Sequence, residues 1–278
     1  MICVAGMPRS GTSLVTQVLY RCGLHLGRPE DLMPAAADNI DGYWEHLSFV
    51  QINERLLAAN GGTWFAPPAT VRPTPAITAA ATSVVAAFDG REPWGWKDPR
   101  NAITLPFWKD LLPALKVIVC LRHPAETAAS LAASALIPRT WRFYWAVTRG
   151  DSPIALRQRP ARRVGRLWGA ARASMSSARR RALIHDVGLE LWRVYNTRML
   201  EETSASQRLV THYDATLRAP RVELERILAF AGLQPSAAVL DDAVRLVAPR
   251  LRHQRADATR LTPETEALYA RLTREARD

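Results

Sequence analysis

The chain opens with the stretch that decides its fold, Met1-Ile2-Cys3-Val4-Ala5-Gly6-Met7-Pro8-Arg9-Ser10-Gly11-Thr12-Ser13-Leu14-Val15-Thr16-Gln17-Val18-Leu19. Its apolar first residues predict a buried strand, and the apolar spacing after Gly11 predicts a helix. The two glycines let the loop between them turn tightly, so that backbone N–H groups and the helix start face an anion. The stretch predicts a phosphate-binding cradle, with an ordinary glycine-containing turn as the alternative.

The cradle differs from a nucleoside-triphosphate loop at one position. That motif reads G-x-x-x-x-G-K-[ST], where the lysine contacts the β- and γ-phosphates and the hydroxyl holds magnesium. Here Thr12 follows Gly11, and the cation lies inside the loop as Arg9. The loop is therefore suited to a phosphate-type anion but lacks the lysine that serves a triphosphate.

Length and composition predict one soluble α/β domain, because 278 residues with 48% hydrophobic residues provide ample material for a core. No apolar stretch approaches the ~20 residues of a membrane-spanning helix. The sequence starts directly on its first predicted strand, which leaves no room for a signal peptide. Cys3, Cys22 and Cys120 are widely spaced in apolar sequence and predict buried reduced thiols. We therefore expect a cytoplasmic protein.

The formal net charge of +11 arises in one segment. Between Arg139 and Arg181 lie 12 arginines and a single acid, Asp151, so this segment carries 12 − 1 = +11. The rest of the chain has 25 basic residues (37 − 12) and 25 acidic residues (26 − 1), and therefore no net charge. The basicity is a local property of this segment.

A second anion contact is predicted after the clearest strand, Lys116–Leu121, whose continuous apolar run is typical of a parallel strand covered on both faces. Arg122 follows this strand, and ligands of open parallel sheets bind beyond the carboxyl ends of the strands. Ser130 lies about two helical turns later, in a helix predicted over 125–133, and can reach the same group. A surface salt bridge is the alternative role of Arg122.

Periodicity and capping residues predict the other elements. We predict helices over 47–59, 75–88, 105–112, 183–202, 220–232, 237–247 and 263–274, with strands ending near residue 97 and over 209–214. The stripe of Leu189, Trp192, Tyr195 and Met199 predicts a core-facing side of the helix over 183–202. Together with the loop, these elements predict a three-layer α/β/α fold with a central, mainly parallel sheet.

Three of these motifs resemble those of the sulfotransferases that use 3′-phosphoadenosine 5′-phosphosulfate. The loop Gly6–Ser13 resembles their 5′-phosphosulfate loop, and Arg122 with Ser130 resembles their 3′-phosphate site. The stretch 210–214, followed by the helix over 220–232, resembles their strand end with a tyrosine near the adenine.

The closest likeness is to bacterial members of this family. They carry a Gly-Tyr-Trp-Glu stretch, as at 42–45, and a Trp-Lys-Asp-Pro-Arg stretch, as at 96–100. The resemblance covers residues 1–133 and 183–255. It implies a single sulfotransferase domain over 1–278 with a P-loop-like nucleotide-binding fold.

The resemblance also implies the reaction and its site. A sulfuryl group passes from the phosphosulfate to a hydroxyl or an amine, and adenosine 3′,5′-bisphosphate is released. By analogy with phosphoryl transfer, the protein mainly positions the reactants and neutralises charge, so no metal is implied. Lys97 occupies the place of the lysine that stabilises the departing charge, assisted by Arg9. The donor-binding residues implied are Arg9, Ser10, Gly11, Thr12, Ser13, Arg122, Ser130 and Tyr213.

The general base of this site has several candidates. Many cytosolic members use a histidine two positions after the lysine, where this chain has Pro99. Other members use a glutamate, and Glu45 fits because a carboxylate among aromatic side chains can have the raised pKa of a base. His46 and Asp98 are competing candidates, and a purely structural Glu45 is a further alternative.

Two basic segments depart from the family or extend it. The insertion over about 135–182 predicts a lid over an acidic or lipid-linked acceptor, a membrane-surface helix, or a poorly ordered solvated excursion. A smaller cluster follows at 250–255, where Arg252 and His253 either close over the 3′-phosphate or form an exposed link between helices.

Two other classes of function stay open from the sequence. A P-loop nucleotide kinase requires magnesium-dependent ATP binding, which Thr12 in place of lysine disfavours. A non-catalytic module would bind a membrane or, less expected, a nucleic acid through the basic insertion, with steep salt dependence.

For a transferase, the acceptor is a carbohydrate, a lipid-linked molecule or another small molecule. Four tryptophans near the proposed site are suited to stacking on a sugar or an aromatic ring, or alternatively belong to the core: Trp44, Trp64, Trp94 and Trp96.

Overall fold

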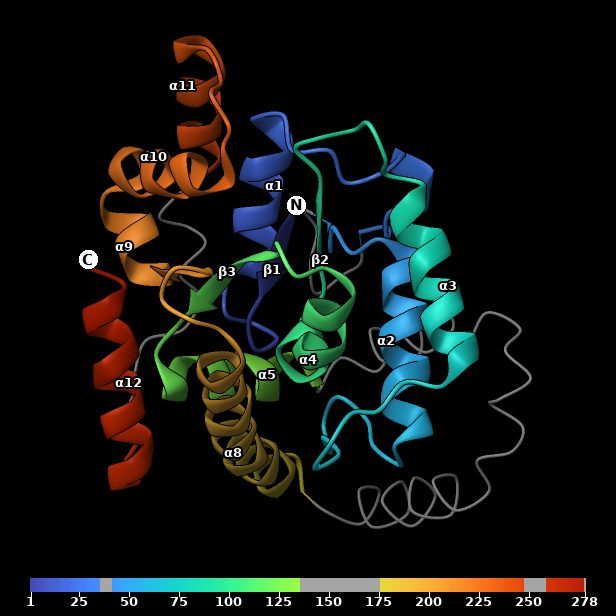
Figure 1. The fold of residues 1–278 in the computed structure, drawn as a ribbon. Helices are drawn as coiled ribbons and strands as arrows, with labels where there is room; N and C mark the ends of the chain where they lie inside the picture. The colour runs from blue at the N-terminus through green and yellow to red at the C-terminus, as the bar shows by residue number, and fades with distance from the viewer. Residues whose placement is uncertain (36–41, 136–175, 248–258, 278) are drawn as a thin grey trace.

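A parallel sheet forms the centre of the molecule. The computed structural model describes residues 1–35, 42–135, 176–247 and 259–277. Within these ranges four strands lie in the order β2-β1-β3-β4, and every neighbouring pair is parallel (Figure 1). The strands are β1 (Ile2–Ala5), β2 (Gly95–Lys97), β3 (Lys116–Leu121) and β4 (Arg208–His212). The described sheet is thus parallel throughout, as the sequence predicted for most of it.

Helices cover both faces of this sheet and form two separate cores. On one face, Cys3 and Ala5 pack with α2 (Leu47–Ala59), α4 (Asn101–Leu111) and α8 (Ser177–Glu202). On the other face, Ile2 and Val4 pack with α1 (Thr12–Arg21), α10 (Pro220–Ala231) and α11 (Ala237–Leu246). Successive side chains of a strand point to opposite faces, so β1 contributes to both cores. The predicted three-layer α/β/α arrangement is confirmed.

The remaining elements complete these layers. They are the 3-10 helix η1 (Pro29–Asp31) and the helices α3 (Pro75–Ala86), α5 (Pro124–Ala135), α9 (Tyr213–Arg218) and α12 (Pro263–Glu275). α3 lies along α2, and α5 lies against α8 (Figure 1). A Cβ at Gly188 of α8 would lie only 3.0 Å from the Cα of Ala128 in α5, so the missing side chain permits this close helix packing.

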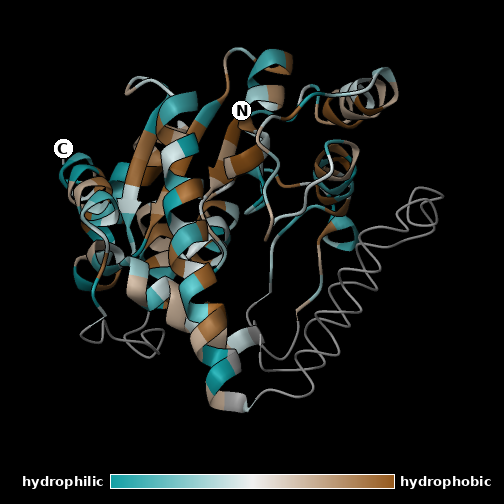
Figure 2. Cartoon of the chain, turned by 90° about the horizontal axis from the view of Figure 1, so that it is seen from below, coloured by the Kyte–Doolittle hydropathy of each residue, from teal (hydrophilic) through white to brown (hydrophobic). Residues whose placement is uncertain are grey.

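Most predicted core residues are buried. Trp192, Tyr195 and Met199 belong to one core, whereas Leu189 is only partly buried. Trp94 and Trp96 belong to the same core and lie beside Phe49, whose ring stacks on that of Trp96 at 4.6 Å. The three cysteines are buried and free, as predicted. Figure 2 shows the strands mostly in hydrophobic colours, while the helices mix hydrophobic and hydrophilic residues.

Three predicted boundaries were wrong. α8 begins at Ser177, six residues before the expected start, because the Ser176 side chain caps it by accepting the N–H of Arg179 at 3.3 Å. α4 begins at Asn101 instead of residue 105. β4 ends at His212, whose Nδ1 accepts the N–H of Asp214 at 3.1 Å and so starts a helix where continued strand was expected.

The basic segments lie largely outside the described residues. Of the predicted insertion over about 135–182, residues 136–175 are outside, and the end that is described belongs to α8. Arg252 and His253 are also outside. Among the helices that the structure describes, none has both the length and the apolar character that crossing a membrane requires.

Candidate active site

The predicted phosphate loop lies between β1 and α1 at the carboxyl end of the sheet. Gly6 approaches β3 so closely that a Cβ would lie 2.8 Å from the carbonyl oxygen of Cys120. Gly11 precedes α1 with a φ of 92° and provides no side-chain cap, so the first-turn N–H groups keep their capacity to bind an anion. Arg9 inside the loop has a φ of 75°, an uncommon conformation that clusters at functional sites.

Replacing Gly11 by alanine is expected to lower stability and anion binding together. The substitution costs about 1–3 kcal/mol for a left-handed backbone, and the new methyl group would lie 2.6 Å from Cδ2 of Tyr213. Gly232→Ala is the matched control, because Gly232 has a φ of 72° and no atom of the described residues lies within 4 Å of its Cβ position. We expect both variants to unfold at lower urea concentration and only Gly11→Ala to weaken binding of adenosine 3′,5′-bisphosphate. Equal nucleotide binding by both would contradict this role of Gly11.

Two arginines meet beside the loop, as predicted. Arg9 Nε donates to Ser130 Oγ of α5 at 3.1 Å, and Arg122 Nη1 donates to the carbonyl oxygen of Arg9 at 3.4 Å. The guanidinium of Arg122 also lies over the ring of Tyr213, 4.7 Å from its centroid. The ends of β1, β3 and β4 therefore bring these four side chains together, at the place where open parallel sheets bind ligands.

Glu126 is a member of this group that the sequence analysis missed. It is 2% exposed, and its Oε2 accepts Arg122 Nε at 3.1 Å. Glu126 lies in the first turn of α5, four positions after Arg122, and this short spacing between opposite charges is the signal that was overlooked. Glu126 fixes the guanidinium of Arg122 in one orientation beside the loop.

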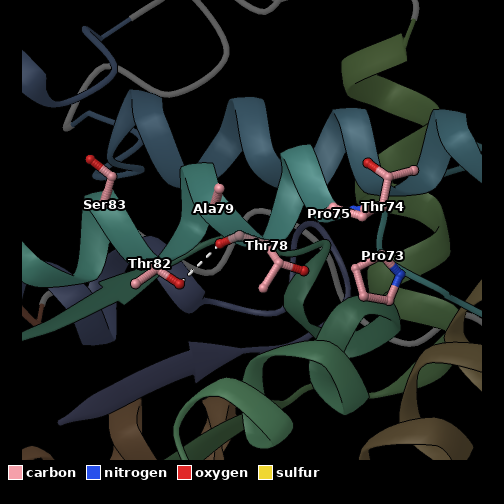
Figure 3. A pocket seen from close by; sticks show the side chains of 7 residues that line it. All are labelled: Pro73, Thr74, Pro75, Thr78, Ala79, Thr82 and Ser83. Atoms are coloured by element: carbon pink, nitrogen blue, oxygen red, sulfur yellow. Dashed lines mark hydrogen bonds between the residues drawn. The ribbon is translucent and has the colours of Figure 1, made fainter.

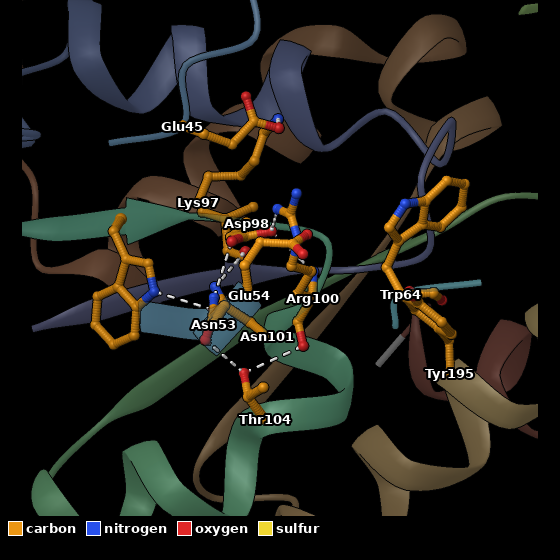
Figure 4. Close-up of polar contacts among 12 residues, drawn as sticks. Glu45, Asn53, Glu54, Trp64, Lys97, Asp98, Arg100, Asn101, Thr104 and Tyr195 are labelled. Carbon is orange, nitrogen blue, oxygen red and sulfur yellow. Dashed lines mark hydrogen bonds and ion pairs between the residues drawn. The ribbon is translucent and has the colours of Figure 1, made fainter. Parts of the chain in front are cut away.

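A second, buried charge pair joins two further predicted residues. Lys97 is the last residue of β2 and pairs in register with Val4, so it lies next to the strand that leads into the phosphate loop. Its Nζ donates to Glu45 Oε1 at 2.6 Å, and the two side chains are 2% and 6% exposed (Figure 4). The segment before Glu45 is attached to the loop helix, since Ser13 Oγ donates to the carbonyl oxygen of Tyr43 at 3.3 Å.

The carboxylate of Glu45 lies in a buried environment that changes its pKa. Burial raises its pKa, and the positive charge of Lys97 opposes this rise. Its second oxygen, Oε2, is buried and accepts no hydrogen bond from any described residue. A buried oxygen without a donor is costly, so this atom marks a place where an incoming hydrogen-bond donor would be stabilised. Trp44, directly before it, has a φ of 65°, a second uncommon backbone conformation at this site.

The two competing candidates for the base have other partners. His46 Nδ1 accepts the N–H of Ser48 at 3.3 Å and caps α2, while its ring packs edge-on against Phe49 and Phe88. Burial lowers its pKa. Oδ1 of Asp98 accepts hydrogen bonds from the backbone N–H of Arg100 at 2.9 Å and from Arg100 Nη1 at 2.7 Å. Oδ2 of Asp98 accepts one from Asn53 Nδ2 at 2.8 Å. Both oxygens of Asp98 are thus occupied by structural hydrogen bonds, unlike Oε2 of Glu45.

Four buried or partly buried polar residues below the pair were not anticipated: Asn53, Glu54, Arg100 and Asn101 (Figure 4). Asn53 lies on the apolar stripe of α2, and a polar residue on such a stripe was the available signal. In the first turns of α4, Asn101 Oδ1 accepts a hydrogen bond from Asn53 Nδ2, and Thr104 Oγ1 donates one to Asn53 Oδ1.

A shallow hollow at the start of α3 lies apart from these residues (Figure 3). Its lining is neutral and includes none of the predicted site residues: Pro73, Thr74, Pro75, Thr78, Ala79, Thr82 and Ser83. A second, small hollow borders the phosphate loop and is lined in part by Ser10, Gly11, Cys120 and Tyr213. The charged groups therefore place the candidate active site at the loop and not at α3.

A parallel three-layer fold with a glycine-bounded loop between β1 and α1 defines a P-loop-like fold. Known proteins make this more specific. The model of the sulfotransferase family matches residues 2–149, which is more than half of the chain. The chain belongs to the sulfotransferase family, and it is a sulfotransferase enzyme.

Two solved structures show the same fold. The sulfotransferase domain from the curacin biosynthetic pathway is 16% identical, with a TM-score of 0.52, over 98% of this chain and 97% of that chain. The sulfotransferase domain from the olefin synthase of Synechococcus PCC 7002 is 17% identical, with a TM-score of 0.52, over 98% and 94% of the two chains. No significant match was found among curated protein sequences.

Proposed function

We propose that this sulfotransferase takes its sulfuryl group from 3′-phosphoadenosine 5′-phosphosulfate and transfers it to a hydroxyl or an amine. The acceptor is a carbohydrate, a lipid-linked molecule or another small molecule. Transfer occurs by in-line displacement, with the attacking and departing oxygens on opposite sides of the sulfur.

The observation that carries this proposal is the Lys97–Glu45 pair beside the phosphate loop. A cation and a carboxylate with one oxygen to which no described residue donates are the two groups that sulfuryl transfer needs next to a bound phosphosulfate. Lys97 neutralises the charge that develops on the departing phosphate oxygen. Glu45 accepts the proton that the acceptor loses.

The reaction then balances in one displacement. The acceptor oxygen or nitrogen attacks the sulfur, and the bond between sulfur and the bridging oxygen breaks. The bridging oxygen leaves as part of adenosine 3′,5′-bisphosphate, and the acceptor proton moves to Oε2 of Glu45. Since the ammonium of Lys97 has three N–H groups, it can keep its bond to Oε1 while another N–H contacts the departing oxygen.

The donor is held at its two ends by the loop and by β3. Backbone N–H groups at Gly11, Thr12 and Ser13, together with Arg9 and Ser10, bind the 5′-phosphosulfate. Arg122 and Ser130 bind the 3′-phosphate, and the Tyr213 ring lies near the adenine. Arg252 and His253, outside the described residues, are proposed to close over the same phosphate.

The Arg-rich segment between Arg139 and Arg181 is proposed to contact acidic acceptors or a membrane surface. Its 12 arginines and one acid favour anionic partners. We further propose that the enzyme acts in the cytoplasm.

Binding of adenosine 3′,5′-bisphosphate tests the donor site directly. We expect calorimetry to show binding that does not depend on magnesium. Arg122→Ala is expected to weaken this binding about tenfold to a hundredfold, because a hydrogen bond to a charged group contributes about 1.5–3 kcal/mol. Arg208→Ala is the matched control: Arg208 is equally buried, at 6% side-chain exposure, and also pairs with a glutamate.

Radiolabelled phosphosulfate with a panel of phenols, sugars and amines then identifies the acceptor class. The proposal fails if the wild-type protein does not bind the bisphosphate, or if it binds only ATP and only with magnesium. Equal losses from Arg122→Ala and Arg208→Ala would show that the effect is structural and would remove Arg122 from the donor site.

A further inference from the structure

A network of buried charges and amides lies directly below the Lys97–Glu45 pair. Arg100, 1% exposed, donates from Nε to Glu54 Oε1 at 2.5 Å and from Nη1 to Asp98 Oδ1 at 2.7 Å (Figure 4). None of these three residues has a role in the proposed transfer step. Because a buried arginine is expensive to desolvate unless it is fully paired, the network needs an explanation.

The network connects the two chain segments that carry the reacting groups. Glu54 lies on α2, which begins two residues after Glu45. Arg100 lies in the turn that follows Lys97 at the end of β2. The Arg100–Glu54 ion pair therefore bridges α2 and the end of β2, with Arg100 three residues after Lys97 and Glu54 nine residues after Glu45.

Asn53 strengthens the same connection. Its Nδ2 donates to Asp98 Oδ2 at 2.8 Å and to Asn101 Oδ1 at 2.9 Å. Its Oδ1 accepts Thr104 Oγ1 and Trp108 Nε1, both at 2.8 Å. The amide of Asn53 thus makes four hydrogen bonds, which is its full capacity, and fixes α2 against α4 and the turn after β2.

We infer that Arg100 and Glu54 are positioning residues that hold the carboxylate of Glu45 at hydrogen-bond distance from Lys97, where both can act on the reactants. This inference rests on the proposed function. A planar guanidinium bonds well to carboxylates in only a narrow range of positions. The pair with Asp98 holds Arg100 within its own turn, and the pair with Glu54 fixes how α2 lies on the end of β2. A shift of about 1 Å between reacting groups can reduce a rate about a hundredfold. The 2.6 Å contact of Lys97 with Glu45 therefore depends on this support.

The chain contains a matched ion pair at the opposite end of the sheet. Arg208, at the start of β4, donates to Glu275 Oε1 at 2.5 Å, the same distance as in the Arg100–Glu54 pair. The glutamate side chains are 25% and 26% exposed, and both arginines are nearly buried. Arg208 is the first residue of β4, so it lies at the amino-terminal edge of the parallel sheet. The phosphate loop lies at the opposite, carboxyl edge. Loss of the two pairs should thus cost similar stability but different activity.

The experiment compares Glu54→Gln with Glu275→Gln. The probe is 3′-phosphoadenosine 5′-phosphosulfate with water as the acceptor, measured as release of adenosine 3′,5′-bisphosphate in a single turnover. We expect Glu54→Gln to lower the rate constant at saturating donor about tenfold or more, with an unchanged Kd for the bisphosphate. We expect Glu275→Gln to leave both quantities unchanged, although thermal unfolding shifts downward by a similar amount in the two variants.

A second pair keeps the inference testable if the glutamine variants fold poorly. Arg100→Lys and Arg208→Lys retain the charge but lose the planar fork, and only the first is expected to slow transfer. The positioning role is overturned if Glu54→Gln and Glu275→Gln, or the two lysine variants, have equal rates, or if the loss appears in the Kd. A wild-type protein that binds the bisphosphate but never cleaves the donor would instead overturn the proposed function, and this inference with it.

Discussion

Glu45→Gln is expected to reduce the turnover number about a hundredfold to ten-thousandfold, the range that a general base contributes. Glutamine has nearly the same shape as glutamate but cannot take the proton that the acceptor loses. Binding of adenosine 3′,5′-bisphosphate should change little, since the proposed phosphate contacts come from the loop and from Arg122. The measurement is release of the bisphosphate from the phosphosulfate, together with calorimetry of the product.

The pH dependence gives this prediction a second readout. The base must be ionised, so wild-type activity falls as the pH drops through the pKa of Glu45. Burial raises this pKa above the ordinary glutamate value, which moves the acidic limb of the rate profile to higher pH. Glu45→Gln should lack the limb, whereas Glu275→Gln should retain it. A variant that keeps both the wild-type rate and the limb would leave Glu45 with a structural role only.

Lys97→Met is expected to destabilise the fold by about 3–5 kcal/mol, the usual effect of removing one partner of a buried ion pair. The methionine fills most of the lysine volume, but the buried carboxylate of Glu45 loses its counter-ion. Chemical denaturation measures the loss. Lys97→Met with Glu45→Gln removes both charges and is expected to recover a large part of the stability, because no unpaired charge remains.

The sign of the pH effect follows from the raised pKa of Glu45. A carboxyl with a raised folded pKa contributes stability below its unfolded pKa and loses this contribution as the pH rises through the folded value. In Lys97→Met the opposing positive charge is absent, so the pKa of Glu45 rises further. The deficit of the variant should therefore be smaller at pH 5 than at pH 8. Equal deficits at both pH values would show that loss of packing dominates.

Local patterns in the sequence predicted those parts of the site whose residues are close together in the chain. The phosphate loop needs only β1, two glycines and the start of α1, and its interactions lie within a few residues. The strand over 116–121 was predicted to the residue because a continuous apolar run has few alternatives in a parallel sheet. The prediction that Arg122, directly after this strand, contacts the ligand followed from the rule that such sheets bind ligands at their carboxyl edge.

Other features depend on contacts between distant segments. α4 starts early, at Asn101, where Asp98 and Asn101 both bond to Asn53. Asn53 lies 45 and 48 positions earlier in the chain than these two residues. Tyr213 was expected at the end of a strand, and the cap by His212 places it instead at the start of α9, where its ring covers Gly11. Neither arrangement has a pattern within one window of sequence.

The sequence by itself determined the layered fold, the phosphate loop and the family, because periodicity, glycine positions and strand ends are local properties of the chain. Only the tertiary structure decided which carboxylate meets Lys97. The sequence favoured Glu45 over its competitors His46 and Asp98, but only folding gave each its partners: a lysine for Glu45, a helix start for His46, and an arginine with an amide for Asp98. Hydrogen bonds and burial are set by the residues that packing brings together, and no spacing in one segment reports them.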